Sequence, residues 1–309
     1  MTAAKREVVK VPALIASAAL ALAALTVAPA APSVSQSVAQ PPTPVVVAVR
    51  ASHHSPTGTP AFDRVAFRFR AGLPSNVRVR YVSRVIADAT GKPVPVPGRA
   101  LLGVRFSPAD AHDAGGSTAP ARVAFRLPNV MTAVRSGDFE AVTSYALGLA
   151  KRTPVHVLRL HHPDRIAVDV GAAFRTVPRR VWFLDSSAFT ANQQPFFHFV
   201  RRPVVPQSPA RAVLDRLFAG PLPSEQAAGL RLLRSGATGL AGPSIRDGVA
   251  RVRMTGGCSS GGSTVTLAGE VTPTLKQFPS VRWVKIYDPS GHTEHPRGHT
   301  DSIPSCLEP

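Results

Sequence analysis

Beyond its N-terminus, the sequence lacks any apolar run longer than a strand or a short helix. This absence excludes a second membrane-spanning helix, which needs about 20 apolar residues. The one long apolar run, residues 11–27, follows three basic residues and precedes a triplet of small residues. That order is typical of a signal peptide and predicts residues 1–30 as the signal, cut after Ala30. An uncleaved N-terminal anchor is the alternative. In both cases we expect an exported protein, extracellular or associated with the cell wall.

Cysteine is scarce, with Cys258 and Cys306 as the only two. Two cysteines in an exported chain are most simply a disulfide, because the extracellular environment is oxidising. A bridge between them would close a loop of nearly fifty residues. Neither cysteine lies near the N-terminal apolar run, so the sequence gives no support for lipid attachment there.

Acidic residues are half as frequent as basic ones, 18 against 36, and the formal net charge is +18. Arginine supplies 30 of the basic residues. A chain this basic suits an anionic partner such as nucleic acid or an anionic wall or lipid polymer, although basic residues also occupy solvated strand faces. An exported chain is sent away from nucleic acid, so we expect none as a partner. Cell-wall polysaccharide or envelope proteins are the partners that we predict.

Familiar catalytic motifs are also missing. The glycine-rich segment 255–264 has no G-x-S-x-G elbow, and it has no lysine where a phosphate-binding loop requires one. His292, His295 and His299 have helical spacing, but the prolines and glycines among them exclude a helix. We therefore predict no catalytic residue, no metal site and no cofactor. The alternative is a metal-dependent envelope hydrolase built on these histidines and Cys258.

Alternating apolar and polar residues dominate the first half of the chain. Residues 31–58 are rich in Pro, Ser, Ala, Thr and Val, which is typical of a flexible linker, with one possible strand at 45–49. From Phe62 onwards, "FDRVAFRFR" and "VRVRYVSRV" alternate strictly, and further short strands follow. These strands predict an all-β sandwich over residues 59–173. Alternation exposes four arginines that we predict as weak ligand-binding residues, namely Arg68, Arg70, Arg78 and Arg80.

The second half mixes strands with helices. "VWFLD" and "FFHFVRRPV" predict buried strands, and "SPARAVLDRLFAGP" predicts a helix with Ser208 at its cap and a Gly-Pro stop. The Asp-Gly pair at 247–248 predicts the turn of a hairpin. "STVTLAGEVTPTLKQF" has helical spacing, although Pro273 should kink that helix or move its start. The sequence therefore predicts a mixed α/β domain over 178–309, and an α+β protein of two domains overall.

The first half resembles a known family. The matching pieces, in order, are "FDRVAFRF", "VRYV", "GKPVPVPGRALLGVRFSPA", "SGDFEAVTSYALGL" and "HPDRIAVDV", over about 110 residues. They are similar to the AMIN-like domain of exported actinobacterial proteins. The AMIN family proper is a β-sandwich that directs proteins to peptidoglycan, so this resemblance implies a targeting or wall-binding role.

The second half resembles the GerMN domain, a module of exported bacterial proteins linked to sporulation, germination and envelope maintenance. The matching pieces are "VWFLD", "FVRRPV", "VLDRLFAGP", "IRDGVARVRM" and "TLKQFPSVRWVKIYDPSG", over about 125 residues. The chain departs from the family pattern at Pro273 and in its long C-terminal tail. The resemblance implies association with the cell wall and no catalysis.

We therefore expect a non-catalytic exported cell-envelope protein that binds cell-wall polymer, such as peptidoglycan, or an envelope partner. A regulator associated with a membrane sensor is a further alternative. We expect the tail to be an extended strap that leaves the last strand at Asp288 and returns over the domain, until Cys306 bonds to Cys258. The histidines then lie on turns along it.

Overall fold

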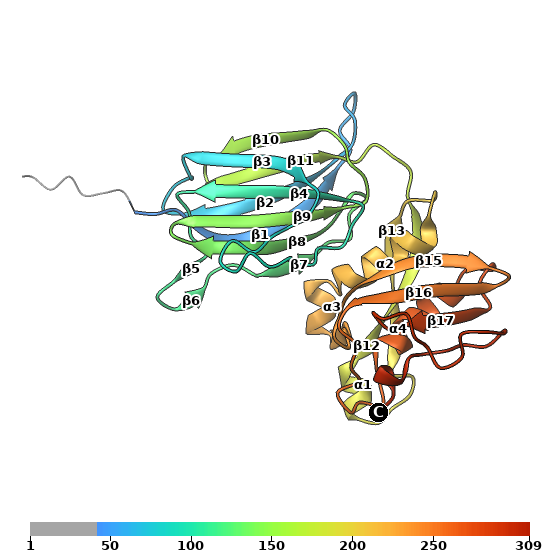
Figure 1. Cartoon of the computed structure of the whole chain (residues 1–309). Coiled ribbons are helices and arrows are strands. Elements are labelled where there is room, and N and C mark those ends of the chain that lie inside the picture. The colour runs from blue at the N-terminus through green and yellow to red at the C-terminus, as the bar shows by residue number, and fades with distance from the viewer. Residues whose placement is uncertain (1–41) are drawn as a thin grey trace, which may run out of the picture. The chain divides into compact units, whose positions relative to one another are not determined.

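The computed structural model describes residues 42–309. The predicted signal peptide, residues 1–30, and the predicted linker as far as residue 41 lie outside the described residues. Two sheets form the first half of this range (Figure 1). Their strand orders are β1-β2-β11-β10 and β3-β4-β9-β8-β7. The first sheet contains β1 Val45–His54, β2 Phe62–Arg70, β10 Val155–Leu160 and β11 Arg165–Gly171. The second contains β3 Asn76–Val82, β4 Ala100–Ser107, β7 Arg122–Ala124, β8 Val130–Phe139 and β9 Val142–Leu149.

A short hairpin of β5 His112–Asp113 and β6 Gly116–Ser117 lies outside these two sheets. The sheets share one apolar core, which confirms the predicted β-sandwich. The Phe67 ring from the first sheet lies 5.0 Å from Phe106 and 5.2 Å from Tyr145 of the second. Tilted and edge-on aromatic pairs of this kind contribute about 0.5–1.5 kcal/mol each beyond burial.

Strand β1 corrects one prediction. We predicted residues 31–58 as a flexible linker with one possible strand at 45–49, but the strand runs over ten residues, Val45–His54, and pairs with β2 along its length. Val46 is fully buried and Val49 nearly so. The apolar run is short and its flanks are rich in Pro, Ser and Thr, so composition hides most of a strand that β2 and the sandwich core stabilise.

The second half of the described range combines two three-stranded sheets with helices, as predicted (Figure 1). The sheet orders are β13-β12-β14 and β15-β16-β17, with β16 and β17 parallel. The strands are β12 Val177–Asp185, β13 Phe197–Val204, β14 Leu230–Arg231, β15 Ala237–Arg246, β16 Val249–Gly256 and β17 Trp283–Tyr287. The helices are α1 Ser186–Thr190, α2 Pro209–Ala219, α3 Pro223–Ala227, α4 Leu267–Lys276 and the 3₁₀ turn η1 Ser305–Leu307.

Most local signals of this half match the structure. One prediction was wrong: "FFHFVRRPV" forms strand β13, but this strand is only partly buried, because His198, Phe199 and Arg201 are exposed. Helix α2 starts at Pro209 after Ser208 and ends before Gly220. Asp247 and Gly248 both have positive φ in the hairpin turn, as a tight two-residue loop requires. Helix α4 starts at Leu267, with Pro273 in its interior. Its Leu267, Val271 and Leu275 are fully buried against the sheets.

The C-terminal tail is the predicted strap. Cys306 and Cys258 form a disulfide with a Cα–Cα distance of 5.7 Å. On the way there Ser302 pairs with Lys285 of β17, so the tail extends the sheet by one short parallel bridge. The buried Lys285 ammonium donates to the carbonyl oxygens of His295 and Arg297, which holds the turn between them.

Candidate functional site

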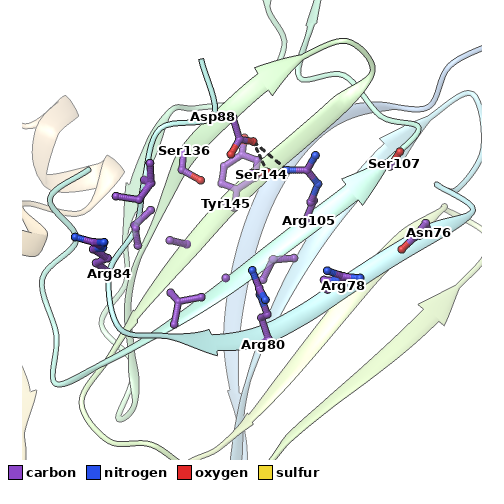
Figure 2. Close-up of a pocket in the computed structure, with 16 residues that line it drawn as sticks. Asn76, Arg78, Arg80, Arg84, Asp88, Arg105, Ser107, Ser136, Ser144 and Tyr145 are labelled. Carbon is purple, nitrogen blue, oxygen red and sulfur yellow. Dashed lines mark hydrogen bonds and ion pairs between the residues drawn. The ribbon is translucent and has the colours of Figure 1, made fainter. Parts of the chain in front are cut away.

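An open groove lies on the outer face of the sheet that contains β3, β4 and β9. Its volume is about 580 Å³. Figure 2 shows Arg78, Arg80 and Arg105 around its middle, with Arg84 at one end and Asn76 at the other. Four guanidinium groups therefore line one groove, and Asp88 is the only acidic residue among the described residues that line it.

Strand alternation produces the groove. In β4, Leu102, Val104 and Phe106 point into the core and are almost completely buried, so Gly103 and Arg105 point outwards. In β3 the arginines are the exposed members of the alternation. In β9 the outward residues are Ser144, Ala146 and Gly148, all small. The small side chains of β9 form the bottom of the groove, and the longer arginine side chains of β3 and β4 form one wall.

A loop of residues 84–98, which we name the crossing loop, forms the opposite wall. Its Asp88 N–H donates to Ser136 of β8, and Leu149 of β9 accepts from the backbone just after the loop. Two glycines allow this close approach: a Cβ atom at Gly137 would overlap the Asp88 side chain, and one at Gly148 would overlap the Pro97 carbonyl oxygen. The crossing loop is therefore seated on sheet backbone.

Three of the four groove arginines have no acidic partner within the described range. Arg78 on β3 lies directly opposite Arg105 on β4, and Arg80 follows on the same face. Like charges directly opposite one another destabilise a strand pair. No ion pair found within residues 42–309 includes Arg78, Arg80 or Arg84. The groove therefore offers charge and hydrogen-bond donors that an anion would satisfy.

Asp88 reduces this charge only in part. Its Oδ2 lies 3.5 Å from Arg105 Nη1 and accepts a hydrogen bond of 2.7 Å from Ser144 (Figure 2). The Arg105 side chain stays 52% exposed, so this pair contributes about 0–1 kcal/mol. Asp88 anchors the crossing loop and leaves most donors of Arg105 available.

The structure separates the four arginines that the sequence singled out. Arg78 and Arg80 line the groove, whereas Arg68 and Arg70 are exposed on β2 of the other sheet. Arg70 pairs there with Asp113 at 2.9 Å. Sequence reasoning missed Arg84 and Arg105. For Arg105 the alternation of "LLGVRF" carried the signal, but the register that places it opposite Arg78 was not visible.

The remaining predicted site residues lie in the second domain. Cys258 is bonded to Cys306, so it offers no thiolate. His292, His295 and His299 are exposed, and His299 stacks on Trp283 with ring centroids 4.7 Å apart. Across residues 42–309 they form no three-ligand group with neighbouring side chains.

One three-ligand group does occur elsewhere in the described range. It contains Asp110, His112 and Asp138, whose ligand atoms lie within 4.8 Å of one another. Both Asp138 oxygens already accept hydrogen bonds, from the Ala111 N–H and from His112, and Arg135 lies 3.4 Å away. The Asp138 carboxylate raises the pKa of His112 through their hydrogen bond. These contacts stabilise a loop and engage both oxygens of Asp138.

Fold and groove together define a two-domain protein, a β-sandwich with an arginine-lined face followed by a mixed α/β domain. The AMIN-like domain family matches residues 44–172, and the sporulation and spore germination family, the GerMN domain, matches residues 180–287. The chain therefore carries an AMIN-like domain followed by a GerMN domain. No curated protein and no solved structure matches it significantly.

These two domains fit a protein related to the cell envelope or to sporulation. The AMIN-like domain and the disulfide are compatible with export. No helix within residues 42–309 has the length and apolar character needed to cross a membrane.

Proposed function

We propose that this protein is a non-catalytic binding protein of the cell envelope, which holds an anionic cell-wall polymer in the arginine groove of its AMIN-like domain. The observation that carries the proposal is the direct opposition of Arg78 and Arg105, with Arg80 beside them and no acidic partner for Arg78 or Arg80 within the described range. A bound anion removes the repulsion that this arrangement creates.

The chemistry of arginine suits such a ligand. A guanidinium presents a planar fork of donors that matches a carboxylate or a phosphate with two parallel hydrogen bonds. Peptidoglycan carries carboxylates, and wall polymers attached to it carry phosphodiesters. The groove is open along β3 from Asn76 to Arg84, so a chain can pass through it. The AMIN-like fold supports the assignment to the wall.

The absence of catalysis is part of the proposal. It is supported by the disulfide, which occupies the one thiol of the hydrolase alternative, and by the dispersed tail histidines. It is also supported by the groove itself, whose acidic residue Asp88 is engaged with Ser144 and Arg105.

The test is sedimentation of the protein with purified cell wall. The groove variant Arg78→Ser/Arg80→Ser removes two charges that have no partner in the described range, so folding should be unaffected. We expect its apparent Kd to rise at least tenfold, equivalent to about 1.4 kcal/mol. The matched control is Arg68→Ser/Arg70→Ser, with the same charge change on the other sheet, and we expect less than a twofold effect.

The source of the anion is resolved by repeating the assay with wall from which the phosphate-bearing polymers have been removed. Retained binding identifies peptidoglycan carboxylates, and lost binding identifies phosphodiesters. Equal loss in both double variants would mean that only overall charge matters and would overturn the groove assignment. Hydrolysis of wall by the purified protein would overturn the non-catalytic assignment.

A further inference from the structure

The GerMN domain has its own cationic surface, on one face of the β12-β13 pair. Arg180 lies directly opposite Arg201, and Trp182 lies directly opposite Phe199. Because side chains two residues apart share a face, these four residues form one cluster, which we name the arginine–aromatic face. The arginine–aromatic face shares no residue with the groove of the AMIN-like domain.

The two arginines repeat the like-charge opposition of the groove. Neither Arg180 nor Arg201 belongs to any ion pair found within residues 42–309. By contrast Arg202, the next residue along β13, is buried and forms a double hydrogen bond to Glu225. A depression of about 550 Å³ opens beside Arg180 and Arg201. The buried Arg202 therefore has an acidic partner, whereas the exposed Arg180 and Arg201 remain available to a ligand.

The aromatic side chains add apolar surface to this charge. The Trp182 and Phe199 rings lie 5.5 Å apart, and the Arg180 guanidinium lies 4.8 Å from the Phe199 ring centre. Phe199 remains 46% exposed, so it offers apolar surface beside the charge. A guanidinium held against an exposed ring presents a hydrogen-bond fork next to an apolar surface.

Helix α4 makes this face rigid. The side chains of Glu270 and Thr274 in this helix accept hydrogen bonds from the backbone N–H groups of Leu184 and Trp182. Gln277, the residue after the helix, accepts one from the N–H of Arg180. Helical steps of four and three residues thus satisfy alternate N–H groups along one edge of β12. The edge is occupied and cannot accept an added strand, so a ligand meets the side chains instead. The backbone beneath the face is therefore ordered before a ligand binds, which lowers the entropy cost of binding.

We propose that the arginine–aromatic face binds an acidic glycan, with a pyranose ring stacked on Phe199 and Trp182 and its carboxylate held by Arg180 and Arg201. The C–H groups on one face of a pyranose carry partial positive charge, which the negative face of an aromatic ring attracts. A neutral glycan would leave the opposed arginines uncompensated, and a simple anion would leave the rings exposed. A ligand that carries both a pyranose ring and a carboxylate matches the rings and the arginines together. Its binding does not depend on the groove of the AMIN-like domain.

The experiment uses the fluorescence of Trp182. The chain has two tryptophans, and Trp283→Phe leaves Trp182 as the only one. The probe is a hexamer of galacturonic acid, and a hexamer of N-acetylglucosamine is its neutral counterpart. We expect the acidic hexamer to change Trp182 emission saturably and to bind at least tenfold more tightly than the neutral one.

Variants then locate the site. In the Trp283→Phe background, Arg180→Ser/Arg201→Ser and Phe199→Ser should each weaken acidic-hexamer binding at least tenfold. The matched control Arg246→Ser/Arg253→Ser removes two other exposed arginines of this domain and should change the Kd less than twofold. The groove variant Arg78→Ser/Arg80→Ser should also leave this Kd unchanged, so failure of either site is distinguishable from failure of the other.

Three results would overturn the proposal. Equal affinity for the acidic and neutral hexamers would show that the arginines do not bind the carboxylate. Unchanged binding in both face variants would remove the site. Self-association of the unaltered protein that Phe199→Ser abolishes, measured by sedimentation velocity, would make this face a contact between two copies of the chain.

Discussion

Gly148 of β9 lies directly beneath Pro97, so that a Cβ atom at Gly148 would overlap the Pro97 carbonyl oxygen. The crossing loop is in contact with the sheet at this point. Gly148→Ala should therefore push the loop outwards and lower the free energy of unfolding by about 1–3 kcal/mol, the usual cost of overpacking. Urea unfolding followed by circular dichroism measures this loss.

Gly103→Ala is the matched control for that substitution. A Cβ atom at Gly103 would lie 3.5 Å from the nearest side chain, an ordinary van der Waals contact. We expect its stability to equal or exceed that of the unaltered protein, because alanine is less costly than glycine in a strand. Equal stability of the two variants would show that the crossing loop is not seated on the sheet.

The disulfide should hold the GerMN domain and its tail together. In the chain-entropy model, closing the loop between Cys258 and Cys306, 48 residues apart, contributes about 4 kcal/mol. Cys258→Ala/Cys306→Ala should lose a comparable amount. Both tryptophans, Trp182 and Trp283, lie in this domain, so tryptophan fluorescence in urea reports on it selectively. A loss under about 1 kcal/mol would mean that the Lys285 and Ser302 contacts alone hold the tail.

The buried Glu270 should make GerMN stability depend on pH. Burial raises the pKa of Glu270 well above its ordinary value of 4.5, and the N–H groups of Leu233 and Leu184 only partly oppose this rise. Because the folded pKa exceeds the unfolded one, the stability contribution is complete below pH 4.5 and is lost as the pH rises through the folded pKa. The loss is at most about 1.4 kcal/mol per pH unit.

Glu270→Gln removes this titration while preserving the side-chain shape. Relative to the unaltered protein, its free energy of unfolding should fall less steeply as the pH rises above 4.5, by the linkage relation. Urea unfolding at a series of pH values, followed by tryptophan fluorescence, gives both slopes. Parallel slopes would mean that Glu270 does not change its protonation on unfolding in this range.

Local signals in the sequence predicted much of the fold. The alternation of "FDRVAFRFR" predicted β2, the Asp-Gly pair predicted the β15-β16 turn, and Ser208 with Pro209 predicted the start of α2. Each of these signals acts within a few residues. The disulfide was also predictable, because two cysteines allow only one pairing.

The arginine groove could not be predicted in full, because it depends on contacts between residues far apart in the sequence. Alternation placed Arg68 and Arg78 equally on exposed faces, because it fixes the face of a strand and not the sheet that the strand joins. The crossing loop could not be located, since its contacts join Asp88 and Pro97 to strands about fifty residues away. One signal was present: Ser144, Ala146 and Gly148 alternate with large apolar residues, which indicates a face covered closely by backbone.

The most direct test of the groove assignment is the Kd for purified cell wall of a variant in which the groove is filled without a change in its charge. Gly103 lies on the floor between the arginines, and a leucine there would occupy the space while every guanidinium remains. We expect Gly103→Leu to keep the Tm of the unaltered protein and to raise its Kd for purified cell wall at least tenfold. An unchanged Kd in this folded variant would contradict the central claim that the polymer lies in the groove.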